Sequence, residues 1–351
     1  MPAVDSLRGP ILRSVSRSFY LSVRILPKGL RDPVALGYLL ARASDTIADT
    51  TDAPAESRAQ KLEALAKAIQ DESARETIVD LGSSFAPLQK DNSERALIEK
   101  LPQILAWLNQ VESADQSDIK AVLERINRGQ LNDLQLFRDP KQVVALEKSD
   151  DLDEYTYLVA GAAGEFWTRL GFRHLRKFAR RDENEMLDLG KRYGMGLQLI
   201  NILRDAGNDL RAGRCYFPNE ELAAARMEPA QVLREPQRFF PIYRKWLKKA
   251  EHGIEAGIEY ADAVRNRRVR FATALPALIG ARTIALLRDA GATVLQRKIK
   301  VPRNEVRSMI TRLAMSFASR TQIERMFREL GRGDLPQSPR RFGESLLSHK
   351  K

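Results

Sequence analysis

Two aspartate pairs with the same four-residue spacing, Asp45 with Asp49 and Asp205 with Asp209, lie inside two long helical patterns far apart in the chain. This spacing places both carboxylates of a pair on one face of a helix, about one turn apart. Like charges so placed destabilise a helix unless a cation lies between them. Hard carboxylate oxygens favour Mg²⁺, whose shell is usually completed by substrate phosphate oxygens. Two such helices facing each other would therefore clamp a diphosphate.

Each pair continues a stripe of polar residues along its helix. Steps of three and four residues back from the first pair reach Arg42 and Tyr38, and from the second pair they reach Asn201 and Gln198. The flanks of both stripes are mainly Leu, Ile, Val and Ala. An isolated acidic pair could be a solvated surface, which a chain with 30% charged residues holds by chance. A polar stripe on an otherwise apolar helix favours an inward, wet cavity.

Helical periodicity extends over nearly the whole chain, and almost no segment alternates like a strand. The expected helices are Ser6–Ser22, Asp32–Thr50, Glu56–Gln70, Ser93–Val111, Gln116–Leu136, Leu152–Leu170, Glu183–Asp209, Phe239–Ala263, Phe271–Ala290 and Pro302–Leu330. This order predicts an all-α fold. No low-complexity run or fixed-period repeat divides the chain, so we expect a single domain over residues 1–351, with a flexible basic tail from about 337 to 351. The stretch from Asp80 to Asp91 is expected to be a surface connection.

Cysteine, histidine and hydropathy exclude several classes of protein. The one cysteine, Cys215, excludes an intrachain disulfide, and the three histidines have no zinc-site spacing. We therefore expect a reducing compartment and oxygen ligands for any metal. The N-terminus lacks the order of a secretory signal, and uncharged runs such as 101–111 and 271–281 are too short to span a bilayer. These features predict a cytoplasmic protein.

The net charge of +12 and pI near 9.8 raise nucleic acid as a partner. Basic residues are nevertheless spread over most helices, with no zinc-finger spacing and no basic patch of stacking aromatics, so no nucleic-acid partner is expected. A basic surface suits a phosphorylated substrate. It also allows peripheral contact with the anionic inner face of a membrane.

Four motifs in order resemble the squalene and phytoene synthase family: Ser16–Phe19, Tyr38–Asp49, Tyr155 with Val159–Gly161, and Gln198–Asp209 with Gly213–Pro218. The match covers roughly Ser14 to Pro218. It implies the isoprenoid synthase helical bundle, with a central active-site cavity whose polar mouth holds Mg²⁺ and diphosphate and whose interior is apolar. The residues of the first aspartate motif are closer to those of squalene synthases. The residues of the second aspartate motif resemble carotenoid-type members as closely as squalene synthases. Membrane-anchored relatives end in a hydrophobic helix that this sequence lacks, so the resemblance is closest to soluble bacterial squalene synthases.

The resemblance also implies roles for individual residues. Metal ligands would be Asp45, Asp49, Asp205 and Asp209, and diphosphate-binding residues Ser16, Arg17, Arg42, Gln198, Asn201, Arg204 and Arg214. Tyr155, with Tyr38 nearby, would serve the proton step, and Lys298, Lys300 and Arg303 would contact NADPH. Each role has a structural alternative: arginines in ordinary salt bridges, Tyr155 as an aromatic wall and the basic segment as a solvated loop. Gly161 and Gly164 would leave room for an isoprenoid chain or allow close helix packing.

The function implied is a prenyltransferase of the farnesyl-diphosphate farnesyltransferase type. It would use Mg²⁺ to join two farnesyl diphosphates head to head through presqualene diphosphate, and NADPH to reduce that intermediate to squalene, in sterol or hopanoid biosynthesis. The alternative is the same fold making presqualene diphosphate, dehydrosqualene or phytoene without a reductive step. A helical adaptor without catalysis is a different class, which Mg²⁺ and diphosphate binding would distinguish.

Overall fold

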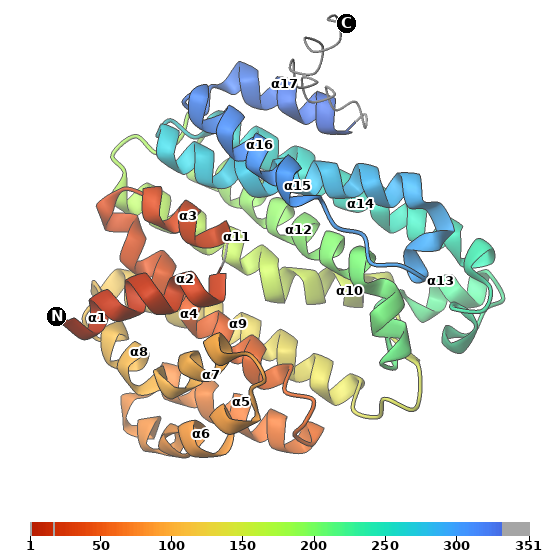
Figure 1. Cartoon of the computed structure of the whole chain (residues 1–351), viewed down its shortest axis with the longest axis horizontal. Helices are drawn as coiled ribbons and strands as arrows, with labels where there is room; N and C mark the ends of the chain where they lie inside the picture. Colours follow the sequence, from red (N-terminus) through yellow and green to blue (C-terminus); the bar gives the residue numbers. More distant parts are fainter. Residues whose placement is uncertain (1, 17, 332–351) are drawn as a thin grey trace, which may run out of the picture.

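The computed structural model describes residues 2–16 and 18–331, which form an almost entirely helical molecule (Figure 1). The first helices are α1 (Pro2–Ser6), α2 (Leu12–Ser16), α3 (Ser18–Ile25), α4 (Lys28–Ala48), α5 (Ala55–Gln70), α6 (Val79–Ser84), α7 (Asn92–Glu99), α8 (Leu101–Leu108) and α9 (Ser113–Leu136). The others are α10 (Ser149–Thr156), α11 (Ala162–His174), α12 (Glu183–Arg211), α13 (Asn219–Ala224), α14 (Pro236–Ala263), α15 (Arg267–Ala290), α16 (Arg303–Met315) and α17 (Arg320–Gly331). Within the described residues the strands are the short parallel pair β1 (Val144–Ala145) and β2 (Arg214–Cys215). The all-α prediction is confirmed; Arg17 and the predicted tail 337–351 lie outside the described residues.

The long helices α4, α9, α12, α14 and α15 begin and end within a few residues of the predicted ranges. Four predicted helices are instead interrupted. The segment 6–22 contains the π-helical stretch Leu7–Ile11. The segment 93–111 divides at Lys100, because Pro102 lies in the first turn of α8 and has no backbone N–H to continue α7. The segment 152–170 contains the π-helical stretch Tyr157–Gly161, and 302–330 divides between α16 and α17.

The prediction of a surface connection from Asp80 to Asp91 is wrong. The segment continues from α6 into a 3₁₀ turn, and Leu81, Phe85 and Gln89 are buried. The Gln89 side chain donates to the Thr50 hydroxyl at 2.9 Å and so joins this segment to the end of α4. Leu81 and Phe85 have helical four-residue spacing, which the polar composition around them obscured.

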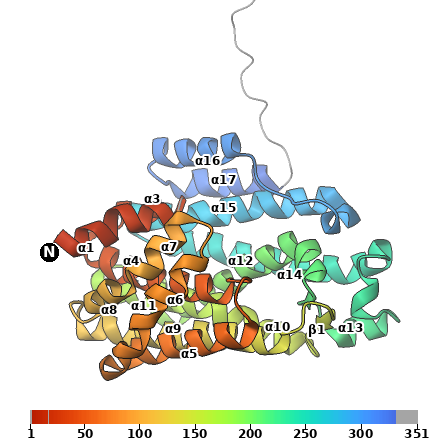
Figure 2. The same cartoon turned by 60° about the horizontal axis from the view of Figure 1, so that its bottom comes forward.

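Two clusters of buried apolar side chains form the interior. One is built mainly from α1 to α9 with α11, the other from α12 to α17, and α12, α14 and α15 contribute to both. Helices α12 and α14 lie side by side (Figure 2), and a Cβ on Gly196 would lie 2.7 Å from the Gly253 Cα. The backbones therefore touch where the clusters meet. The single domain over 1–351 stays a prediction.

The small residues at the start of α11 serve helix packing. A Cβ on Gly164 would lie 1.9 Å from the carbonyl oxygen of Gly190 in α12, and one on Gly194 would lie 2.2 Å from the carbonyl oxygen of Ala160. Any side chain at these positions would separate α11 from α12. Of the two alternatives for the small residues, close packing accounts for Gly164.

One helical segment, Arg267–Leu295, is long and apolar enough to cross a bilayer by length and composition alone. However, 83% of its most apolar window is buried inside the molecule. It packs against α14, α12 and α17. Core helices pass the same test of length and composition.

Candidate active site

The C-terminal parts of α4 and α12 bring the two aspartate pairs close enough for the charges of Asp49 and Asp209 to interact, beside a cleft that Asp45 lines. Burial, and then the charge of Asp49, raise the pKa of Asp45 to about 7. Burial also raises the pKa of Asp209, to which the charges of Asp205 and Asp49 contribute. Carboxylates of the two helices are therefore close enough to repel each other. Negative charge at a helix C-terminus is also unfavourable to the helix dipole, so this cleft attracts cations.

Basic side chains pair with the carboxylates of α12. Arg214 donates to Asp209 at 2.7 Å, Arg204 donates to Asp205 at 2.5 Å, and the Lys298 ammonium lies 3.6 Å from Asp205. Burial opposes ionisation of Asp205, but Arg204 and Lys298 hold its pKa below the usual value. Arg214 lies in β2, which the hydrogen bond from Val144 N–H to the Gly213 carbonyl at 3.0 Å ties to β1.

Helix α9 contributes a third polar stripe, Asn127, Gln130 and Asp133, which the sequence analysis missed. Gln130 donates to Asp45, and both polar atoms of the Asn127 amide are buried without a hydrogen-bond partner. Burial raises the pKa of Asp133 to about 6, and the charges of Asp209 and Asp49 act on it as well. The three-residue spacing on a helix with apolar flanks was the available signal.

Tyr155 lies beside this third stripe. Its ring stacks on Tyr216, with centroids 5.1 Å apart, and the Tyr216 hydroxyl donates to Asp133 at 2.6 Å. Burial, with the charges of Asp133 and Asp45, raises the pKa of the Tyr155 phenol. Tyr155 is therefore a neutral phenol near carboxylates from both α4 and α9.

The other predicted tyrosine, Tyr38, is also near Asp45. Burial raises its pKa to about 12, and the charges of Arg42 and Asp45 act on it. Its hydroxyl donates to the Val15 carbonyl at 3.2 Å. Arg42 forms an ion pair with Glu94 of α7, so in this structure its partner is a glutamate and not a motif aspartate.

The remaining predicted residues are less closely connected to the aspartates. The buried Ser16 hydroxyl donates within its own helix, to the Leu12 carbonyl at 2.5 Å. Gln198 and Asn201 hydrogen-bond to each other at 3.3 Å.

Lys300 and Arg303 are exposed. The part of the chain that the structure describes provides no hydrogen bond or ion pair for either side chain. Of the predicted NADPH residues, only Lys298 contacts the cleft.

Two cavities open beside these residues. A cavity of about 390 Å³ is lined by Tyr38, Arg42 and Asp45 together with residues of α2 and α7. A second, of about 250 Å³, is lined by Asp133, Tyr155 and Tyr216 together with both apolar and polar residues, among them Leu136, Phe137, Leu146, Leu158, Asn132, Glu147, Asp151 and Glu154. The first cavity therefore adjoins Asp45 of α4, and the second adjoins Asp133 of α9.

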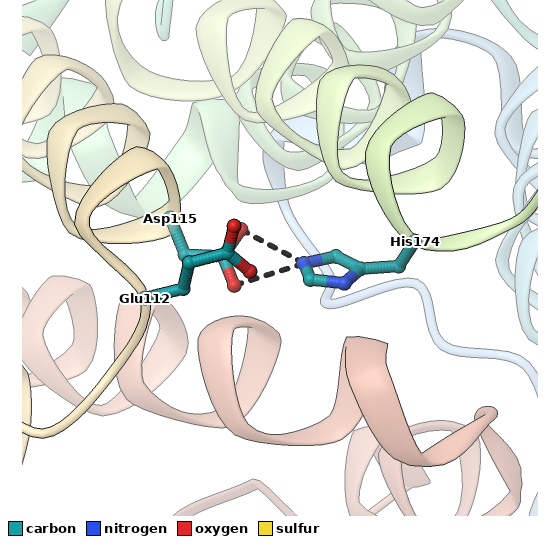
Figure 3. Close-up of side chains that lie close together, drawn as sticks. All are labelled: Glu112, Asp115 and His174. Carbon is teal, nitrogen blue, oxygen red and sulfur yellow. Dashed lines mark hydrogen bonds and ion pairs between the residues drawn. The ribbon is translucent and has the colours of Figure 1, made fainter.

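A separate group of potential metal ligands consists of Glu112, Asp115 and His174 (Figure 3). The His174 Nε2 lies 2.9 Å from both carboxylate oxygens of the buried Asp115. Arg173 donates to the same carboxylate at 2.7 Å. Because a guanidinium already neutralises Asp115, the group is explained as the ion pair that joins the end of α11 to the start of α9.

Comparison with known proteins identifies the family to which the chain is similar. The chain matches the squalene/phytoene synthase family over residues 12–305. It is 29% identical over 210 residues to a squalene synthase of Saccharomyces cerevisiae, covering 60% of this chain and 44% of that protein. It is 28% identical over 230 residues to a bifunctional lycopene cyclase/phytoene synthase of Gibberella fujikuroi, covering 64% and 37%. The chain thus spans less than half the length of either relative.

A solved structure shows the same fold. The complex of TcSQS with the ligand BPH1237 superposes with a TM-score of 0.72 at 20% identity, covering 95% of this chain and 98% of that one. The predicted isoprenoid synthase bundle is therefore confirmed. At this identity the likeness establishes the fold alone.

Proposed function

The chain belongs to the squalene/phytoene synthase family, whose members are prenyltransferases, and on that premise we propose that it joins two farnesyl diphosphates head to head with Mg²⁺. The observation that supports the proposal is the meeting of α4 and α12, where the charge of Asp49 on one helix acts against the ionisation of Asp209 on the other. Carboxylate oxygens so arranged are the ligands that Mg²⁺ prefers.

The residues that would hold the ions are Asp45 and Asp49 on one side and Asp205 and Asp209 on the other. The donor set fits, because it is all oxygen and its mutual repulsion is relieved by divalent charge. One atom supports the fit: within the described residues the buried Asp205 Oδ1 has no partner at hydrogen-bond distance, and the Lys298 ammonium forms an ion pair with it at 3.6 Å. Bound Mg²⁺ would neutralise the charge that develops on the departing diphosphate.

The arginines would bind the diphosphate. Arg204 and Arg214 pair with the α12 aspartates in this structure. When ions neutralise the carboxylates, each guanidinium becomes available for phosphate oxygens, for which its planar fork is suited. Arg42, at the polar cavity, could exchange Glu94 for the same ligand.

A proton must leave when the cyclopropane of presqualene diphosphate closes. Tyr155 is a poor base by itself because its pKa is raised. The Tyr216 hydroxyl, which can hydrogen-bond to the Tyr155 phenol, already donates to Asp133. We assign to Tyr155 the role of accepting the substrate proton. Tyr155 then gives its own phenolic proton to the Tyr216 hydroxyl, and Tyr216 gives its proton to the Asp133 carboxylate. With a pKa of about 6, that carboxylate is mostly ionised at neutral pH and can receive the proton.

In the second half-reaction presqualene diphosphate would lose its diphosphate, rearrange and accept a hydride, giving squalene and NADP⁺. Lys298 and Lys300 would contact the phosphates of NADPH, supported by the position of Lys298 beside Asp205. The second candidate is a reaction without reduction that ends at presqualene diphosphate, dehydrosqualene or phytoene. It is favoured by the similarity to a protein with phytoene synthase activity in its name.

The test is to incubate the purified protein with farnesyl diphosphate and Mg²⁺, with and without NADPH, and to identify the products. Without NADPH, a complete squalene synthase accumulates presqualene diphosphate or the products of its elimination and of its trapping by water. With NADPH, the same enzyme forms squalene instead. Identical products in both mixtures would reject the reductive step. No product under either condition, with geranylgeranyl diphosphate tested in parallel, would reject the prenyltransferase itself.

A further inference from the structure

The turn between α16 and α17 carries two large apolar side chains that no other part of the described chain covers. Met315 is 77% exposed and Phe317 is 70% exposed. Met315 is the last residue of α16, and Phe317 lies two residues further on, in the turn that follows; we call this stretch the tip. Most large apolar side chains elsewhere in the described residues are buried, so an adjacent exposed pair marks a surface that contacts something apolar.

The backbone holds this tip in an unusual conformation. Phe317 and Ala318 have φ angles of +50° and +49°, in the left-handed region that glycine normally occupies. The Ala318 N–H donates to the Leu313 carbonyl at 2.8 Å, and the buried Arg270 donates to the Ala318 carbonyl at 3.1 Å. The strained turn is therefore tied to the body of the molecule, and the Phe317 ring is kept outside.

A dense basic surface adjoins the tip. Segments 176–181, before α12, and 265–268, at the start of α15, contain seven Lys and Arg and no acidic residue, and all seven side chains are exposed. Hydrogen bonds join the three connections: the Arg265 side chain donates to the Ala179 carbonyl at 2.9 Å, and Arg320, just after the tip, donates to the Val264 carbonyl at 3.1 Å. Figure 1 shows the α14–α15 and α16–α17 connections at the same end of the bundle. We call the two segments and the tip the basic face.

The charges of the basic face are crowded. The charges of Arg180, Arg265 and Arg267 all act on Arg320 and contribute to lowering its pKa, after burial. Arg267 and Arg268 lie in the first turn of α15, where positive charge opposes the helix dipole and where no acidic residue is present. Arg320 is paired with Asp262 at 3.2 Å and Arg181 with Glu259 at 3.5 Å, whereas Arg267 and Arg268 form no ion pair within the described residues. The local electrostatic cost of these two arginines therefore indicates a function.

We propose that the basic face docks on an anionic lipid bilayer, with Met315 and Phe317 inserted among the acyl chains and the arginines against the headgroups. An exposed apolar tip within a cluster of Lys and Arg is the arrangement that such a surface recognises. The face lies near the N-terminus of α12, about 30 Å from Asp205 at 1.5 Å per helical residue. Docking therefore leaves the acidic cleft open to a diphosphate.

The test measures co-sedimentation of the full chain with vesicles of equimolar phosphatidylcholine and phosphatidylglycerol, without substrate, so it does not depend on the proposed reaction. The protein should bind these vesicles, bind neutral phosphatidylcholine vesicles weakly, and lose binding as salt is raised. R267Q/R268Q should lower the partition coefficient about thirty-fold, and M315S/F317S about ten-fold. The matched control R244Q/K248Q, which removes two exposed charges from α14, should bind like the wild type.

Equal binding to neutral vesicles, or losses no larger in R267Q/R268Q than in the control, would overturn the proposal. Sedimentation velocity provides the further check. If M315S/F317S converts an oligomer to a monomer and leaves vesicle binding unchanged, the tip is a contact between copies of the chain and the membrane assignment fails. Thermal melts test folding. Because all six altered side chains are exposed, no variant should unfold.

Discussion

Replacing Asp45 by Asn should stabilise the protein at neutral pH in chelator while abolishing prenyl transfer. Burial and the neighbouring Asp49 raise the pKa of Asp45 from 3.8 to about 7. An acid whose pKa is higher in the folded state binds its proton more tightly there, so its contribution to stability is lost as pH rises from about 4 to about 7. Asn removes the charge, keeps the shape and can still accept the hydrogen bond from Gln130.

The size of the effect follows from the same pKa. A difference of roughly 3 units corresponds to a ceiling of about 4 kcal/mol, of which about 2.6 kcal/mol falls between pH 5 and pH 8. Although the Asp45 carboxylate is closely surrounded by protein, part of the side chain faces the cleft, where water enters and screens the charge. We therefore expect a loss of about 1 to 2 kcal/mol in the wild type over this range, and a flatter profile for the variant.

Urea unfolding at pH 5 and pH 8, each in chelator and in Mg²⁺, measures these differences. In Mg²⁺ the wild type should regain stability at pH 8, because the ion neutralises the charge that burial disfavours, whereas Asp45→Asn should gain much less. Asp52→Asn is the matched control, since Asp52 follows α4 closely but is exposed. A wild type and Asp45→Asn with the same pH profile, or with equal stabilisation by Mg²⁺, would refute the assignment of Asp45 to the ion site.

Three further predictions concern catalysis. Arg214→Ala should lower kcat/KM for farnesyl diphosphate about 100- to 1,000-fold, because it removes a charge aimed at the leaving group. Tyr155→Phe and Asp133→Asn should each slow presqualene formation about 10- to 100-fold, and the double variant should be no slower than the slower single variant because both act in one relay. Lys300→Gln should raise the KM for NADPH alone, whereas Lys298→Gln, which also removes the ammonium beside the α12 acids, should slow both half-reactions.

Each of these predictions has its own check in steady-state and single-turnover kinetics. An unchanged specificity constant in Arg214→Ala would return that residue to the role of an ordinary ion pair. Additive losses in Tyr155→Phe with Asp133→Asn would separate the two residues. Activity of Tyr155→Phe close to the wild type would favour an aromatic wall role, and an effect of Lys300→Gln on presqualene formation would place Lys300 at the diphosphate instead of NADPH.

The sequence predicted the features that depend on local periodicity. The helices that carry Asp45, Asp49, Asp205 and Asp209 were expected because each polar stripe repeats at three and four residues within an apolar helix. Their convergence was expected from the shared chemistry of the two pairs, and the effect of the Asp49 charge on the pKa of Asp209 agrees with it. The partner of Arg42 was not predictable, because Glu94 lies 52 residues away and is brought close only by the packing of α7 on α4.

The site residues that the sequence analysis missed depend on contacts between segments far apart in the chain, which local sequence patterns do not predict. Asp133 becomes a site residue only because Tyr216, 83 residues later, donates to it inside the cleft. The sequence near Phe317, where α16 gives way to the turn before α17, contains no glycine or proline. The pattern from Pro302 to Leu330 was therefore interpreted as one helix. A chain that places Phe and Ala in left-handed conformations departs from local preference, and such departures are expected where a surface serves something other than folding. The strained tip and the crowded arginines are therefore two departures from local preference at the same end of the molecule, and we attribute both to the same surface function.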